Sequence, residues 1–204
     1  MFTGLLAAAV LAACGQKTEA PGHPYCPLGN GLHWAYRAVT LGPGGSQVEA
    51  RMETRVEGSE TLNDKDYARF VTRTKVLGSE EPETVYFRSG PEGVFYVKGF
   101  QTDEPEQLYL PADPKTGMTW KVATMTNSVE NRVDGFESVE IDGTKYECVR
   151  ISSRGTLLAG PETVAINGVT YFAKGVGQVK SQMTTMGEGG ERVPLSITLV
   201  DFSD

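Results

Sequence analysis

The sequence predicts an all-β fold, with antiparallel sheets forming a sandwich or a half-open barrel from two tandem copies of one β unit. Three observations point there. Gly, Val, Thr and Tyr are abundant while Leu is scarce, a composition that favours strands and tight turns. Apolar and polar residues alternate over Val48–Val56, as in a half-buried strand. The dipeptide Asp142-Gly143 separates two alternating runs, which is a strong hairpin signal.

Residues 1–13 read as a signal peptide. Residues 5–13 are apolar but fall short of the roughly twenty residues that span a bilayer. The run ends in Leu11-Ala12-Ala13-Cys14-Gly15, which resembles the lipobox of bacterial lipoproteins. That resemblance implies that Cys14 carries diacylglycerol and becomes the new N-terminus. No Lys or Arg precedes the run, a departure that a start codon further upstream would explain.

The residue after the lipobox cysteine implies a destination. In lipoproteins of this kind, Asp at that position retains the protein at the inner membrane, whereas this chain has Gly15. The resemblance therefore implies an exported protein, lipid-anchored in the outer membrane and facing the periplasm. Residues 14–24, which include His23, form a polar run that we expect to act as a flexible tether, with the β domain at 25–204.

Two cysteines remain after Cys14. An even pair in an oxidising compartment suggests a disulfide between Cys26 and Cys148. The alternative is two unrelated thiols, one of them buried in a strand.

The chain resembles itself when its two halves are aligned. Glu53–Glu60 matches Glu130–Glu137, and further matches follow in the same order. They pair Gly31–Trp34 with Gly117–Trp120, Tyr67–Val71 with Tyr146–Arg150, Tyr86-Phe87 with Tyr171-Phe172, and Val97-Lys98 with Val179-Lys180. The order predicts a duplication, with repeat one at 25–100, repeat two at 108–203 and a polar joint at 101–107.

Further turn signals divide the repeats into strands. Asn167-Gly168 has the same hairpin chemistry as Asp142-Gly143. Looser turns are expected at Gly42–Gly45, Gly90–Gly93 and Gly187–Gly190.

The pattern Tyr25-x-Pro27-Leu28-x-x-Gly31-x-x-Trp34-x-Tyr36, echoed from Leu110-Pro111 to Trp120, resembles the opening of a family of uncharacterised bacterial lipoproteins. Tyr171–Val179 is similar to a segment near the end of those proteins. The resemblance implies landmarks of fold and no catalytic residues. A more distant similarity, to the half-open barrels that carry lipoproteins across the periplasm, is an analogy of fold alone.

The sequence offers little catalytic chemistry. It has two histidines without metal-ligand spacing and no Gly-x-Ser-x-Gly elbow, so we expect no metal, no cofactor and no hydrolase triad. We expect His33 to begin a strand with a satisfied hydrogen bond. A net charge of −7 disfavours nucleic-acid binding. The alternative to a non-enzymatic protein is an envelope hydrolase in which repeat-related carboxylates, Glu53 with Glu130 or Glu60 with Glu137, converge in a cleft.

The aromatic residues suggest a binding function. Trp34, Tyr86, Trp120 and Tyr171 occupy equivalent places in the two copies and could line a groove for an acyl chain or an extended peptide. The alternative is that the rings simply fill two sheet cores. The sequence thus predicts a lipid-anchored binding or scaffolding module of the cell envelope, or a purely structural envelope protein, with the membrane, an envelope protein or an acyl or peptide ligand as partner.

Overall fold

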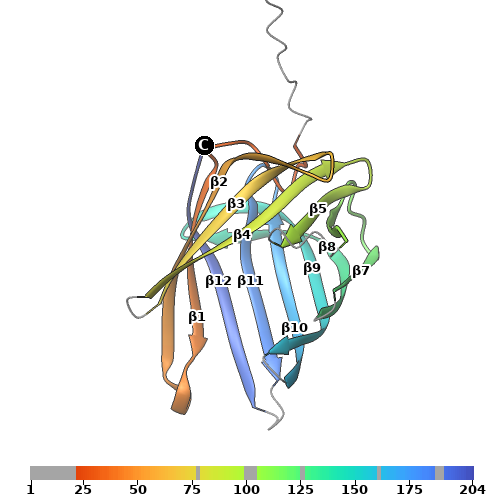
Figure 1. Cartoon of the computed structure of the whole chain (residues 1–204). Coiled ribbons are helices and arrows are strands. Elements are labelled where there is room, and N and C mark those ends of the chain that lie inside the picture. Colours follow the sequence, from red (N-terminus) through yellow and green to blue (C-terminus); the bar gives the residue numbers. More distant parts are fainter. Residues whose placement is uncertain (1–21, 77–78, 99–104, 125–126, 160–161, 187–190) are drawn as a thin grey trace, which may run out of the picture.

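In a computed structural model of the chain, the structure describes residues 22–76, 79–98, 105–124, 127–159, 162–186 and 191–204. Within these ranges twelve strands form one sheet (Figure 1). They are β1 (His33–Leu41), β2 (Gln47–Leu62), β3 (Lys65–Val76), β4 (Ser79–Gly90), β5 (Gly93–Lys98), β6 (Gln107–Pro111), β7 (Thr119–Ala123), β8 (Asn127–Ile141), β9 (Thr144–Ala159), β10 (Glu162–Ala173), β11 (Gly177–Met186) and β12 (Arg192–Ser203).

The sheet is antiparallel throughout and curls into a nearly closed barrel. Its strand order is β6-β5-β4-β3-β2-β1-β12-β11-β10-β9-β8-β7. β1 pairs with β12, so the first and last strands join the two halves of the sheet. The all-β antiparallel prediction is therefore confirmed, and the half-open barrel describes the molecule better than a sandwich of two sheets does.

The two halves of the barrel have the same β-bulge and the same backbone hydrogen bond at repeat-related positions. β2 has a bulge between Val56 and Ser59, and β8 has one between Val133 and Gly135. The amide of Gly31 donates to Val56 O at 3.0 Å, and the amide of Gly117 donates to Val133 O at 2.8 Å. Each half also contributes six strands in the same order. These matches support the duplication that the sequence predicts.

One of the two predicted hairpin dipeptides is wrong. Asp142-Gly143 does connect β8 to β9, with φ values of 48° and 81°. Asn167-Gly168 instead lies inside β10. Gly168 is needed there because a Cβ would come within 2.7 Å of Met183 Cγ on β11. The dipeptide reflects close packing between strands and not a turn.

The segment before β1 covers one end of the barrel. Cys26 is 7% exposed and packs with Val94, Leu110 and Phe172. The amide of Gly175, in the turn between β10 and β11, donates to Pro24 O at 2.7 Å. The first described residues and the C-terminus lie at the upper end in Figure 1, whereas the β1–β2 hairpin lies at the lower end.

Candidate functional site: the barrel lumen

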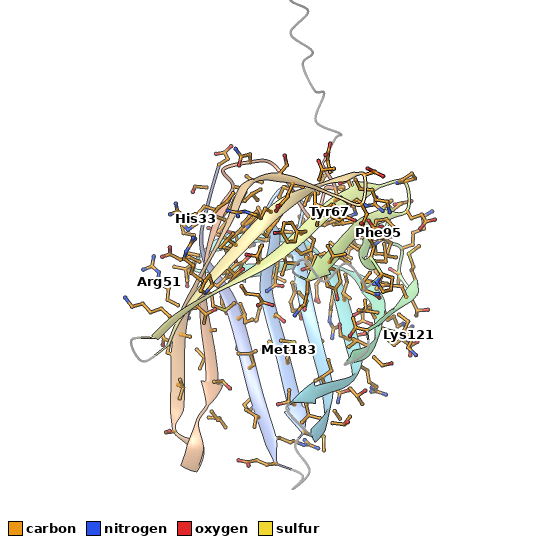
Figure 2. All side chains as sticks on the ribbon, viewed as in Figure 1. His33, Arg51, Tyr67, Phe95, Lys121 and Met183 are labelled. Carbon is orange, nitrogen blue, oxygen red and sulfur yellow. The ribbon has the colours of Figure 1, made fainter. Side chains whose placement is uncertain are left out.

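The barrel encloses a cavity of about 580 Å³, which we call the lumen. Residues of all twelve described strands and of the Tyr25–Pro27 segment line it. Its size falls within the range of small-molecule sites. Figure 2 marks Met183, one of the lining residues, in the middle of the barrel.

Aromatic rings form the floor of the lumen beside the covered end. Phe70 stacks on Trp34, with ring centroids 5.6 Å apart, and meets Phe87 edge-on at 4.7 Å. The contacts continue from Phe87 to Tyr109 at 5.0 Å and from Tyr109 to Phe172 at 5.7 Å. These rings come from β1, β3, β4, β6 and β10, so the floor exists only once the barrel has closed.

A belt of hydrogen-bonded polar pairs lies between the floor and the other end of the barrel. The hydroxyls of Thr54 and Thr72 are 2.9 Å apart, and those of Thr170 and Ser181 are 3.1 Å apart. Ser153 donates to Asn131 at 2.7 Å. All six residues line the lumen. Each pair makes one hydrogen bond internally, so an apolar ligand beside the belt costs less desolvation than it would beside unpaired polar groups.

The lumen has one charged pair among its described lining residues. Lys98 Nζ lies 3.3 Å from Glu83 Oε1, and the two side chains are 59% and 63% exposed. Glu83 on β4 is the register partner of Thr72 in the belt, and Lys98 on β5 is the register partner of Val85 on β4. The lumen therefore runs from an apolar floor at the covered end to an uncovered mouth, with a solvated charged pair beside the belt.

The sequence prediction of an aromatic groove places two of its four rings in this site. Trp34 and Trp120 line the lumen. Tyr86 and Tyr171 do not, and their neighbours Phe87 and Phe172 point inward in their place. Tyr86 is nonetheless 2% exposed, and burial together with the Glu60 carboxylate raises its pKa. Alternation gives adjacent residues opposite faces, but it does not say which face is inside.

The floor includes rings that the groove prediction left out, namely Phe70 and Tyr109. Phe70 lies in a strand that the repeat alignment had identified. Tyr109 comes from a five-residue strand next to the predicted joint, where the sequence gives no strand signal of useful length.

The two thiols do not form the predicted disulfide. Cys26 and Cys148 are free and buried in different clusters. Cys26 packs beside the lumen, whereas Cys148 packs with Ile141 and Val179. Burial raises the pKa of Cys26 to about 12 and that of Cys148 to about 11, so both are held as unreactive thiols.

The histidines also differ from expectation. His23, predicted to lie in the tether, is 8% exposed, and its Nε2 is 2.8 Å from Pro111 O. The folded domain thus begins before residue 24. His33 starts β1 as predicted, but its buried Nε2 has no hydrogen-bond partner in the described chain and lies 3.9 Å from Glu53 Oε2.

The repeat-related carboxylates have separate partners. Glu53 pairs with Arg51 at 3.1 Å on the outer face of β2. Glu130 lies on the outer face of β8, and five strands separate β2 from β8 in the sheet. Glu137 lies 3.7 Å from Arg150, while the Glu60 carboxylate interacts with Tyr86 and raises the pKa of its hydroxyl. Outward-facing groups on opposite walls of a barrel point apart, so this geometry does not build the cleft that a hydrolase needs.

A charged cluster braces the outside of the first half. Arg88 donates through Nε to Glu106 Oε1 at 2.6 Å, and the Glu106 carboxylate also accepts from Tyr67 and, at 3.0 Å, from Lys65. The Arg88 guanidinium lies 4.6 Å from the ring centroid of Phe95. Figure 2 shows Tyr67 and Phe95 close to each other at the upper end of the barrel. Arg88, with Tyr67 and Lys65, lowers the pKa of Glu106 to about 2.

Comparisons with known proteins agree on the fold. Residues 103–185, less than half of the chain, match the family model described as DUF3108-like. A protein of Bacteroides fragilis, described as exported and as having a YmcC-like fold, has a solved structure that matches with a TM-score of 0.60. The two are 12% identical, and the match covers 87% of this chain and 98% of that one.

A second solved structure is that of a protein of Parabacteroides distasonis described as a lipoprotein. It matches with a TM-score of 0.54 and 11% identity, over 90% of this chain and all of that one. Both likenesses show a shared barrel fold. No curated protein sequence is similar.

Two further observations concern membrane attachment. Cys14 and the signal peptide at 1–13 lie outside the described residues. In the part of the chain that the structure describes, no helix has the length and apolar character to cross a bilayer.

Proposed function

We propose that the protein is a non-enzymatic, lipid-anchored module of the cell envelope that holds an acyl chain in its lumen. The observation that carries this proposal is the lumen itself, a cavity of about 580 Å³ with a floor of interlocking rings. Apolar walls with a few placed polar groups are typical of sites for small hydrophobic ligands.

The order of side chains along the lumen fits an amphiphile. An acyl chain would lie on the rings and cross the belt, where each polar pair keeps one hydrogen bond of its own and so loses less on leaving water than unpaired groups would. Its polar end would then lie outside the apolar floor, in contact with solvent. An extended peptide fits less well, because backbone amides beside the floor would have no partners.

The place of the N-terminal segment fits an anchored receptor. Residues 22–26 cover the end of the barrel next to the floor. A lipid on Cys14 would therefore hold the protein by its covered end and direct the mouth away from the anchoring membrane. We infer delivery to the outer membrane from Gly15 at the position that follows the lipobox cysteine.

The test is a titration with a long-chain fatty acid that carries an environment-sensitive fluorophore, excited directly. Met183 faces the lumen and its neighbour Gln182 faces out, so Met183→Trp fills the cavity while Gln182→Trp adds the same ring outside. We expect saturable binding by the wild type and by Gln182→Trp, and much weaker binding by Met183→Trp. Equal binding by the two variants, or no binding by a folded wild type, would overturn the proposal.

A further inference from the structure

The barrel has two repeat-related junctions, and only one of them is closed by a strand ladder. At the first, β1 pairs with β12 from His33 and Ser203 to Thr40 and Leu195. The second junction would join β6 to β7, which are the two edges of the sheet. There the described strands touch without a ladder, and each has only five residues. We call this junction the seam.

Side chains bond across the seam where a ladder would otherwise run. The indole N–H of Trp120 on β7 donates to Leu108 O on β6 at 3.1 Å. In the opposite direction, Gln107 Oε1 on β6 accepts from the amide of Ala123 at 3.1 Å. A ladder bond breaks only when the backbone moves, whereas these two break when a side chain changes rotamer. The seam is therefore the line along which the barrel wall opens at least cost.

Trp120 also separates two cavities. One side of the residue lines the lumen, and the other lines a pocket of about 340 Å³ outside the barrel. Apolar residues such as Leu108 and Met118 line most of this outer pocket, and charged side chains join them, with Lys115 Nζ 3.2 Å from Asp113 Oδ2 and Glu92 also in the lining. The Trp120 indole therefore lies where the apolar lumen meets an exterior pocket that has both apolar and charged lining residues.

We propose that the seam is a lateral portal latched by Trp120, and that the ligand is an amphiphile whose acyl chain lies in the lumen while its head group occupies the outer pocket. This inference rests on the proposed function and narrows its ligand to lipids with a head group too bulky to pass along the lumen. Sideways passage lets the chain move without threading the head group past the floor or the belt.

The repeat supplies a matched control for the latch. Trp34 is the counterpart of Trp120 and donates from its indole to Val176 O at 2.6 Å, beside the junction that is paired. Both Trp34→Phe and Trp120→Phe keep an aromatic ring and delete one hydrogen bond. Because both rings also line the lumen, each change removes some contact with the ligand. We expect Trp120→Phe to speed ligand dissociation several-fold more than Trp34→Phe does.

Crosslinking tests the portal directly. In a Cys14→Ser background, the pair Gln107→Cys with Ala123→Cys would be joined by a short bifunctional thiol reagent. The control pair Val39→Cys with Ser196→Cys faces across the closed junction. With a fluorescent phospholipid as probe in stopped flow, we expect the seam crosslink to slow association and dissociation about tenfold or more, as for a locked lid. The control crosslink should change neither rate.

The outcomes separate this inference from the proposed function. Tight binding with rates that the seam crosslink does not alter would overturn the portal and leave the lumen as the site. If the wild type binds no acyl probe, the proposed function and the ligand assignment both fail. The portal is then tested by acrylamide quenching of Trp120 fluorescence in the Trp34→Phe variant. The seam crosslink should reduce this quenching, and unchanged quenching would contradict the portal.

Discussion

At the scale of single residues, His23 fastens the segment that covers the barrel. Its Nδ1 accepts a hydrogen bond from the Tyr25 amide at 3.2 Å, so the ring proton must sit on Nε2, which then donates to Pro111 O. The contact with the Tyr25 amide requires an unprotonated Nδ1 and therefore the neutral ring. Burial lowers the pKa of His23 from its ordinary value of 6.5.

The sign of the resulting pH dependence follows from linkage. The unfolded chain binds a proton on His23 more readily than the folded chain does, so stability falls as the pH drops below about 6.5 towards the folded-state pKa. We expect the midpoint of thermal unfolding to fall between pH 7.5 and 5 by more in the wild type than in His23→Gln, which cannot titrate there. Parallel pH curves for the two proteins would contradict the role of His23.

Glu106 and Glu83 give a matched pair of carboxylates for a stability test. Glu106 is 18% exposed and bonds to Arg88, whereas Glu83 is 63% exposed and bonds to Lys98. We expect Glu106→Gln to cost about 1.5–3 kcal/mol in urea unfolding, as for hydrogen bonds to charged groups. Glu83→Gln should cost less than about 1 kcal/mol, as exposed pairs do. Equal costs would show that the Arg88 cluster does not brace the wall.

The same carboxylate sets part of the acid stability. Because the pKa of Glu106 falls from 4.5 to about 2, its contribution is complete above pH 4.5 and is lost as the pH falls towards 2. Stability measured from pH 6 to pH 2 should therefore decrease less steeply in Glu106→Gln than in the wild type. A curve of unchanged shape would show that Glu106 titrates normally.

At the scale of elements, Gly93 allows β5 and β6 to approach each other. A Cβ there would lie 2.0 Å from Leu110 O and 2.9 Å from the Ala112 amide, at a φ of 146°. Gly58 in the β2 bulge also has a positive φ, of 85°, but nothing lies within 4 Å of its Cβ position. Replacing each glycine by Ala therefore distinguishes the cost of backbone strain, at Gly58, from the added cost of a steric collision, at Gly93.

We expect Gly58→Ala to cost about 1–2 kcal/mol, the strain of an L-residue in a left-handed conformation. Gly93→Ala should cost more and should release β6 from β5, which amide hydrogen exchange over Gln107–Pro111 would detect. If exchange in β6 is the same in both variants, Gly93 is required for its backbone conformation alone and not for contact with β6.

Several elements could be predicted from the sequence because their signals are local. The strand at Val48–Val56 alternates, and Asp142-Gly143 adopts the turn that its dihedral preferences favour. Closure of the barrel could not be predicted in this way, since it depends on β1 meeting β12, and no local pattern records that pairing. The choice of Phe87 over Tyr86 for the lumen depends on the same closure. The hairpin prediction at Asn167-Gly168 was wrong because glycine is favoured both where strands pack closely and where the chain turns.

At the scale of the whole molecule, the twelve described strands enclose an interior whose two ends have different side chains. The covered end holds the aromatic floor, and the polar pairs lie beyond it with Lys98 and Glu83 beside them. Neither half of the barrel could build this interior alone, because the rings of the floor come from β1, β3 and β4 in one half and β10 in the other. The binding site is a property of the closed sheet.

The central claim is that an acyl chain lies in the lumen, and the two tryptophans of the chain test it most directly. Both Trp34 and Trp120 line the lumen. A fatty acid brominated along its chain quenches only indoles that it touches, so we predict saturable quenching of tryptophan emission that an unlabelled fatty acid reverses. Binding of the brominated acid without quenching, or quenching that never saturates, would place the ligand elsewhere and contradict the claim.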